Sequence, residues 1–290
     1  MGKTILYGNG INLLGGGMSW NGVLQHVSNK KFLPPIQSNT LKYEYIILPQ
    51  DETTNCSLVT SKGIFVVTHD GKRIVVPVDT EKNKKASLAR KLKQQNPSYF
   101  YDKLFELNAD NYITTNYELF LSQKFEANSL VAKTDLCNKH RFIEKNGNCK
   151  TFWNIHGDIE DPEHIILGLS DYCQYVAEID KYLNRSKQGD LQSWIDLFFN
   201  TDVHVLGLAM GYEEIDLWNV LTARKRKRRK NADECQNYIY YYAIQDESFD
   251  SGKKELLKAL VVNVVDVEFD WSDNAYKKAY DRIYELIKST

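Results

Sequence analysis

The sequence predicts an α/β fold with an open, mainly parallel β-sheet and helices on both faces, and two observations support this. Short apolar segments alternate with amphipathic segments along most of the chain, a pattern typical of strands joined by crossover helices. Three of the apolar segments end in small polar residues, namely Thr4–Tyr7, Tyr112–Ile113 and Thr151–Trp153. Ligands bind beyond the carboxyl ends of the strands in such sheets. The sequence therefore predicts a crevice where these three ends meet.

Length and composition are those of an ordinary globular protein. The chain has 290 residues, a net charge of −1, 42% hydrophobic residues and 26% charged residues. We expect residues 1–290 to form one domain with a β-hairpin inserted between residues 50 and 80. The near-neutral charge argues against nucleic-acid binding over the whole surface. No apolar run approaches the ~20 residues of a membrane span, and no signal peptide precedes Lys3.

The cysteines favour a reducing compartment. They are scattered and odd in number, with no Cys-x-x-Cys pair: Cys56, Cys137, Cys149, Cys173 and Cys235. This usage is typical of the cytosol rather than of a disulfide framework, so we expect a cytoplasmic protein. Cys137, His140 and Cys149 are irregularly spaced for a metal site, and we expect no metal.

The N-terminal segment combines a strand, a glycine-rich loop and a helix. The strand Thr4–Tyr7 runs into Gly8-Asn9-Gly10, and Ser19 is placed to cap a helix whose apolar face carries Trp20 and Val23. In this arrangement the glycines let a phosphate approach the backbone and the helix N-terminus attracts it. The alternative is a flexible strand–helix connection without a ligand.

The next segment predicts the inserted hairpin. Residues 63–67 and 73–78 are apolar and flank His69-Asp70-Gly71-Lys72, and Asp-Gly is a strong turn signal. We expect an antiparallel hairpin over residues 58–78 that serves as a lid, an edge extension or an oligomer contact, with His69 a solvated turn residue. Residues 43–48 fit either a strand or a helical turn.

The middle of the chain alternates helices and strands. Residues 82–107 predict two helices interrupted at Pro97, with Ser98 as the cap of the second. A strand then ends at Thr114-Thr115-Asn116-Tyr117, followed by a short helix. Residues 139–153 predict a hairpin with Asn146-Gly147 at its turn, which runs into Asn154-Ile155-His156-Gly157.

The C-terminal half continues the alternation. Asp171 is placed to cap an amphipathic helix over residues 172–183. Further helices are expected around residues 191–198, 215–221, 256–260 and 276–287, and strands at 203–208, 238–242 and 261–267. The basic run Arg224–Lys230 predicts a solvated loop, which we favour over a nucleic-acid or partner contact.

Two polar residues at predicted strand ends could carry chemistry. Asn116 offers an amide donor and acceptor for ribose hydroxyls or a water molecule, and His156 can accept a proton near neutral pH. Together with the glycine loop they suit cleavage between a ribose and a good leaving group, such as the cationic nicotinamide of NAD. The alternatives are that Asn116 bonds nearby backbone and that His156 is a satisfied core histidine.

Ordered motifs give the sequence a family resemblance. Gly8-Asn9-Gly10, Thr114-Thr115-Asn116-Tyr117, Ile155-His156-Gly157 and Gly207–Asp216 resemble the motifs of the sirtuin-like (SIR2-like) NAD-cleaving domains of bacterial antiphage defence. The Gly-Asn-Gly form is also similar to the related abortive-infection H family. The resemblance covers roughly residues 4–270 but not the hairpin at 58–78.

The resemblance implies a Rossmann-like, doubly wound domain that hydrolyses NAD to ADP-ribose and nicotinamide. Asn116 and His156 match the catalytic pair of the family. The expected nucleotide-binding positions are Gly8, Asn9, Gly10, Asn12, Thr115, Gly207, Gly211 and Asp216, the last three on the adenosine side. Glu118 replaces a frequent aspartate. The four-cysteine zinc module of protein-deacylating sirtuins has no counterpart here, which argues against a deacylase.

Regulation and partners follow from the same resemblance. An enzyme that depletes NAD has to be silent at rest, so we expect control by homo-oligomer assembly or by a separate defence protein such as a translocase ATPase or a sensor. No membrane association is expected. The alternative function is a non-catalytic module that senses a nucleotide and acts through a partner protein.

Overall fold

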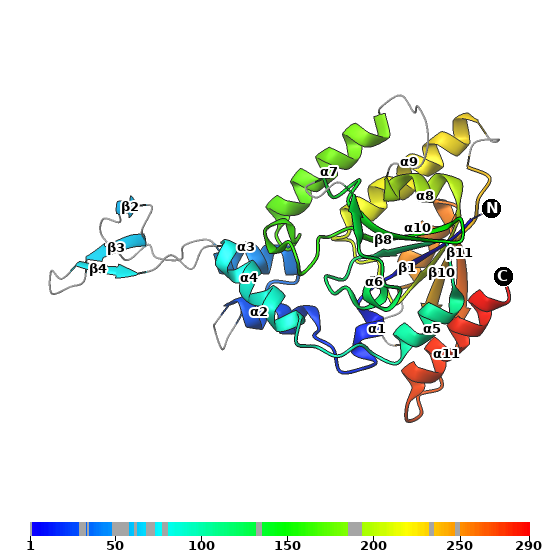
Figure 1. The fold of residues 1–290 in the computed structure, drawn as a ribbon, viewed down its shortest axis with the longest axis horizontal. Coiled ribbons are helices and arrows are strands. Elements are labelled where there is room, and N and C mark those ends of the chain that lie inside the picture. Colours follow the sequence, from blue (N-terminus) through cyan, green and yellow to red (C-terminus); the bar gives the residue numbers. More distant parts are fainter. Residues whose placement is uncertain are drawn as a thin grey trace.

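The fold is centred on an eight-stranded sheet (Figure 1). The computed structural model describes residues 2–28, 33, 35–47, 58–60, 63–67, 73–76, 81–131, 135–184, 193–231, 235–246 and 250–290. Within these residues the strand order is β11-β10-β9-β1-β5-β8-β7-β6. The strands are β1 (Lys3–Tyr7), β5 (Asn111–Thr114), β6 (Ser129–Val131), β7 (His140–Lys145), β8 (Asn148–Asn154), β9 (Asp202–Leu206), β10 (Ile239–Ile244) and β11 (Asn263–Val267).

The register of the central strands positions the site. From β11 to β8 all neighbours are parallel, and only β7 and β6 run antiparallel at one edge. Tyr7 of β1 pairs with Thr114 of β5 on one side and Leu206 of β9 on the other, and Thr114 pairs with Asn154 of β8. Four strands therefore end at one level, and the loops that follow them leave the same edge of the sheet.

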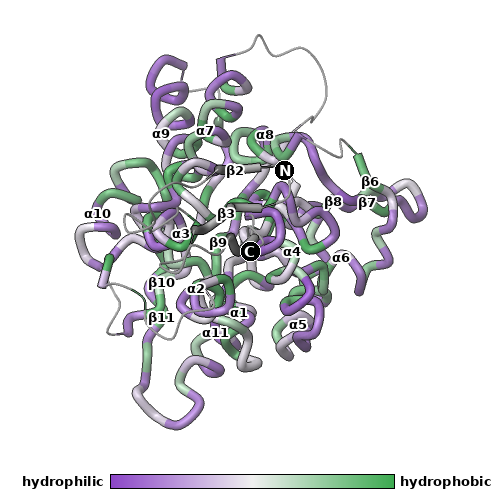
Figure 2. The backbone as a smooth tube through the Cα atoms, turned by 90° about the vertical axis from the view of Figure 1, so that its left-hand side faces the viewer, coloured by the Kyte–Doolittle hydropathy of each residue, from purple (hydrophilic) through white to green (hydrophobic). Residues whose placement is uncertain are grey.

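Helices cover both faces of the sheet (Figures 1 and 2). One face packs against α7 (Leu169–Asn184), α8 (Trp194–Asn200), α9 (Ile215–Lys230) and α10 (Ser251–Ala259). The other packs against α1 (Gly10–Leu13), α5 (Phe100–Leu107), α6 (Phe120–Lys124) and α11 (Ala275–Lys288). The expected α/β class with a doubly wound, mainly parallel sheet is confirmed.

A third hydrophobic cluster lies beyond the carboxyl edge of the sheet. It joins α2 (Trp20–Ser28), α3 (Asn39–Ile47) and α4 (Glu81–Leu92) to residues that follow the central strands. Tyr117, after β5, packs in this cluster and donates a 2.9 Å hydrogen bond to the carbonyl of Ile166. These helices therefore form a wall opposite the strand ends, and the space between them is the crevice that the sequence predicts.

A separate three-stranded antiparallel sheet contains the inserted segment. Its strands are β2 (Leu58–Thr60), β3 (Gly63–Val67) and β4 (Arg73–Val76), with β3 paired to both neighbours. The β3–β4 pair is the hairpin expected from the sequence. Its turn, with His69, lies outside the described residues.

The turn chemistry of the second hairpin follows the sequence closely. Asn146 and Gly147, between β7 and β8, both have positive φ angles of 54° and 75°. A two-residue turn of this kind matches the twist of the flanking strands, which explains the Asn-Gly pair.

Other local expectations need correction. For the segment 43–48, which the sequence left open between a strand and a helical turn, the helical alternative holds over residues 43–47 of α3, and residue 48 lies outside the described residues. Ser98 does not cap α5, because Tyr99 occupies the N-cap and the Ser98 hydroxyl has no hydrogen-bond partner among the described residues. Asp171 lies in the first turn of α7, where its carboxylate accepts hydrogen bonds from the N–H groups of Leu167 and Gly168.

The basic run is helical, so its interpretation as a loop is wrong. Arg224–Lys230 forms the second half of α9, and Arg224 is fully buried. The Arg224 guanidinium donates from Nη2 to the carbonyl and the side chain of Asn237, which is also fully buried. Arg226, Arg229 and Lys230 are exposed at the hydrophilic end of the helix (Figure 2). None of the described helices is long and apolar enough to cross a membrane.

Candidate active site

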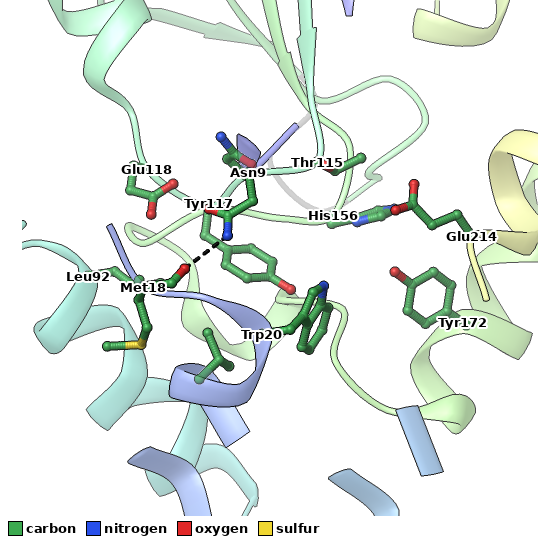
Figure 3. Close-up of a pocket in the computed structure, with 12 residues that line it drawn as sticks. Asn9, Met18, Trp20, Leu92, Thr115, Tyr117, Glu118, His156, Tyr172 and Glu214 are labelled. Carbon is green, nitrogen blue, oxygen red and sulfur yellow. Dashed lines mark hydrogen bonds between the residues drawn. The ribbon is translucent and has the colours of Figure 1, made fainter. Parts of the chain in front are cut away.

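A pocket lies at the carboxyl ends of the central strands. Each strand-end loop contributes to its lining: Asn9 follows β1, Thr115–Glu118 follow β5, and His156 follows β8. Glu214 precedes α9, and Tyr172 lies on the same side of the pocket as Glu214 and His156 (Figure 3). The lining also includes Met18, Trp20, Val23 and Leu92. The predicted convergence of the three strand ends therefore holds, with Asn116 and His156 in one pocket.

Backbone contacts hold Asn116 in position. Its N–H donates to the Thr114 hydroxyl at 3.0 Å, and its side-chain amide donates to the Gly8 carbonyl at 3.4 Å. Asn154 fixes the same turn, because its amide nitrogen donates to the carbonyls of Asn116 at 2.9 Å and Glu118 at 3.1 Å. The loop after β5 is thus tied to both neighbouring strands. None of the described residues donates a hydrogen bond to the amide oxygen of Asn116, which is therefore available to a ligand or a water molecule.

His156 is paired with a carboxylate from another layer. Its Nε2 lies 2.7 Å from Oδ2 of Asp216, and the two side chains are 3% and 0% exposed. Asp216 belongs to the first turn of α9, 60 residues further along the chain. The rings of Tyr172 and Tyr175 pack edge-on against the imidazole. Asp216 thus orients the ring so that Nδ1 is left for chemistry.

The surroundings of His156 favour its protonated form. Burial lowers the pKa of His156, whereas the charge and hydrogen bond of Asp216, with a contribution from Glu214, raise it, and the net shift is upward. A raised pKa makes the neutral imidazole a stronger proton acceptor. The geometry is that of a base held in place by a buried carboxylate.

Two further carboxyl groups line the pocket. Burial raises the pKa of Glu118, and Asn12 donates to its Oε2 at 3.2 Å. Asn12 in turn accepts a 2.8 Å hydrogen bond from the Tyr101 hydroxyl. Burial raises the pKa of Glu214 to about 8, although His156 opposes that shift. Both carboxyl groups therefore favour the neutral form more than an exposed glutamate does.

The glycines of the loop after β1 allow its backbone to pass very close to the backbone of the loop after β9. The N–H groups of Gly8 and Gly10 donate to the carbonyls of Leu206 and Gly207 at 3.1 and 2.8 Å. A Cβ on Gly10 would lie 2.2 Å from the Tyr280 hydroxyl and 2.8 Å from the Gly207 carbonyl. The glycines are thus required for packing of the loops after β1 and β9, and these two N–H groups already have partners within the protein.

The remaining expected nucleotide-binding positions are distributed around the pocket. Asn9 and Thr115 line it, and Asn12 lies behind Glu118. Gly207 lies in the loop after β9 with φ of 63°, which favours glycine. Gly211 does not line the pocket, and its carbonyl accepts a hydrogen bond from the Trp218 indole. Asp216, expected on the adenosine side, is hydrogen-bonded to the imidazole of His156.

Sequence reasoning missed several pocket residues. Glu214 lies inside the Gly207–Asp216 motif, two residues before the aspartate, so the motif itself carried a signal. Tyr172 and Trp20 were assigned only to apolar helix faces, yet both line the pocket. A helical apolar face does not reveal which of its residues borders a cavity.

The cysteine-containing cluster differs from the one considered above. Within the described residues, Cys137 lies near Asp135 and Glu178, whose ligand atoms are all within 4.8 Å of one another. His140 instead hydrogen-bonds to the Asn138 carbonyl through Nδ1 and stacks on Trp153.

Comparisons with known proteins identify the family of the segment that carries the motifs at Asn116, His156 and Asp216. A family model described as a SIR2-like domain matches residues 110–263, more than half of the chain. The match includes Asn116, His156 and Asp216 but not the glycine loop. The protein named NAD(+) hydrolase ThsA from Bacillus cereus (strain MSX-D12) is 26% identical over 168 residues, which are 55% of this chain and 35% of ThsA. The alignment therefore spans about a third of the length of that relative.

Proposed function

Because this chain belongs to the family of SIR2-like domains, we propose that it hydrolyses NAD+ to ADP-ribose and nicotinamide. The observation that carries the proposal is the presence of Asn116 and His156 in one pocket, with His156 oriented by a buried carboxylate. The similarity to a protein named NAD(+) hydrolase supports the same substrate. We further propose that the activity serves antiphage defence by depleting the cofactor.

The pocket offers the groups that this hydrolysis requires. NAD+ carries a cationic nicotinamide that leaves as a neutral molecule, so the bond between nicotinamide and ribose breaks without strong acid catalysis. The positive charge that develops on the ribose is then quenched by a water molecule. The Asn116 amide can position that water, and Nδ1 of His156 can take its proton. The balanced products are ADP-ribose, nicotinamide and one proton.

The polarity of the pocket suits a cation. Glu118 and Glu214 lie on opposite sides of the lining, with the aromatic rings of Trp20 and Tyr117 between them and the ring of Tyr172 beside Glu214 (Figure 3). Aromatic faces attract a cationic ring, and a cationic ring in turn favours the ionised form of a neighbouring carboxyl group. The charged nicotinamide of NAD+ therefore fits this lining better than the neutral ring of the reduced cofactor.

An assay of nicotinamide release tests the proposal. The protein is incubated with NAD+, alone and with candidate activators, and nicotinamide is quantified by chromatography. We expect release by the wild type and its loss in both Asn116→Ala and His156→Ala. A matched control is His204→Ala, because His204 is buried between β10 side chains away from the pocket. Unchanged release in both site variants would remove the assignment.

Regulation is part of the proposal. We propose that homo-oligomer assembly, or a separate protein such as a translocase ATPase or a sensor, keeps the enzyme silent before infection. Light scattering and the release assay, performed over a range of protein concentrations, test this together. A monomer with full constitutive activity would contradict it. Tight nucleotide binding without release under any of these conditions would instead favour the non-catalytic sensing module.

A further inference from the structure

Glu214 is a pocket residue to which the hydrolysis step proposed for Asn116 and His156 gives no role. It occupies the N-cap position of α9, but its side chain makes no capping hydrogen bond. It lines the pocket instead (Figure 3). Its Oε2 is buried and has no hydrogen-bond partner among the described residues. The carboxyl group therefore presents an unused acceptor at the site.

The neighbouring groups do not satisfy that acceptor. Nε2 of His156 is already bound to Asp216, and the Lys253 ammonium donates to the carbonyl of Ala209. A buried acceptor without a donor costs about 1–3 kcal/mol, and more when it is charged. Because Glu214 lines the pocket, a bound ligand can supply that donor.

The position of Glu214 indicates which part of the ligand supplies them. Its carboxyl group lies beside the imidazole of His156, across the pocket from Glu118 (Figure 3). A ligand group next to His156 is next to the bond that is cleaved. In NAD+ that group is the ribose bonded to nicotinamide, which carries two adjacent hydroxyls. A carboxylate with two oxygens is a suitable acceptor for such a diol, as in other dinucleotide sites.

We propose that Glu214 binds the hydroxyl groups of the ribose that carries nicotinamide. This inference rests on the proposed function, because it assumes a ligand with a ribose beside His156. Glu214 is then a binding residue that holds the sugar so that its anomeric carbon faces Asn116 and His156. The ionised carboxyl group can accept hydrogen bonds from both hydroxyls, so a bound ribose opposes the upward pKa shift that burial gives Glu214.

Calorimetric titration with two ligands tests the proposal without requiring turnover. ADP-ribose contains the ribose in question, and ADP lacks it. At pH 9, above the pKa of about 8, the Glu214 carboxyl group is ionised, and there we expect Glu214→Gln to weaken ADP-ribose binding by about 10- to 100-fold, the usual effect of losing hydrogen bonds to a charged group. ADP binding should stay within about twofold of wild type. Glu213→Gln is the matched control, because Glu213 accepts from the Asn39 N–H and does not line the pocket.

The outcomes separate this inference from the proposed function. Equal ADP-ribose affinity in wild type and Glu214→Gln, equal weakening of both ligands, or no binding of ADP-ribose to the wild type would each overturn it. If Glu214-dependent binding is found but NAD+ is never cleaved, the ribose contact stands and the hydrolase assignment fails. Circular dichroism and thermal unfolding of each variant confirm that the compared proteins are folded.

Discussion

Asp216 accepts a 2.7 Å hydrogen bond from His156 although the two residues belong to different layers of the fold. His156 follows β8 at the edge of the sheet, and Asp216 lies in the first turn of α9, which packs on one face. Since both side chains are buried, water cannot replace either partner. The orientation of the imidazole therefore depends on where α9 begins.

Replacing Asp216 by asparagine should preserve the fold and impair catalysis. The amide can keep one hydrogen bond to Nε2, but it removes the charge and permits the wrong tautomer of His156. We expect nicotinamide release to fall about 10²- to 10⁴-fold, with a smaller change in the KM for NAD+. Asp196→Asn is the control, because Asp196 is also buried but accepts from Tyr182. Wild-type release by Asp216→Asn would contradict the role of the pair.

Stability should fall as the pH rises from about 5 to 8. The pKa of Glu214 is about 8 in the folded protein and 4.5 as a free side chain, and the pKa of His156 is also raised. Between the unfolded and folded pKa values the folded state binds more protons than the unfolded state. The free energy of unfolding therefore falls as the pH rises toward the folded pKa values. The groups that act on Glu214 are His156, Asp216, Lys253 and Glu213.

The variant Glu214→Gln separates the contribution of this carboxyl group to the pH dependence of stability from the contribution of His156. Because glutamine does not titrate, the variant should lose less stability than wild type between pH 5 and 8, by up to a few kcal/mol. Chemical denaturation at several pH values measures the difference. If the free energy of unfolding changed with pH in the same way for both proteins, a strongly raised pKa of Glu214 would be ruled out.

Gly10→Ala should destabilise the fold. The added Cβ would approach the Tyr280 hydroxyl and the backbone of Gly207, and the backbone cannot move without disturbing β9. We expect a loss of about 1–3 kcal/mol in the free energy of unfolding, as for other overpacked sites. Tyr280→Phe in the same chain should recover part of it. Gly252→Ala, within helix α10, should be neutral or slightly stabilising.

Arg224 and Arg226 lie two residues apart on α9 and should respond differently to alanine. Arg224 is fully buried and bonded to Asn237, so its removal leaves a cavity and unpaired acceptors. We expect Arg224→Ala to cost about 2–5 kcal/mol. Arg226 is exposed, and its replacement should change the free energy of unfolding by less than about 0.5 kcal/mol. Urea denaturation followed by circular dichroism compares them, and similar losses would mean that burial of Arg224 contributes little.

The sequence predicted what depends on local patterns. The strand endings at Thr114 and Asn154, the Asn146-Gly147 turn and the convergence of Asn116 with His156 followed from apolar runs, turn chemistry and strand polarity. These signals need only neighbouring residues and the rule that parallel strands end at one edge.

The missed features depend on long-range packing. Composition made Arg224–Lys230 resemble a loop, but burial of Arg224 against Asn237 extends α9 through the whole run. The pairing of His156 with Asp216 joins residues 60 positions apart. No periodicity encodes which helix start faces which strand end, so the Gly207–Asp216 motif could point to the site without showing that Glu214 lines the pocket.

The two hydrogen bonds donated by the Asn154 amide make the site depend on the chemical identity of this one side chain. Its side-chain nitrogen serves the carbonyls of both Asn116 and Glu118. Deamidation would convert that nitrogen into a third oxygen among acceptors, so attraction would become repulsion. The loop that contains Asn116 and Glu118 would then lose two hydrogen bonds through a change in Asn154, a residue that does not itself line the pocket.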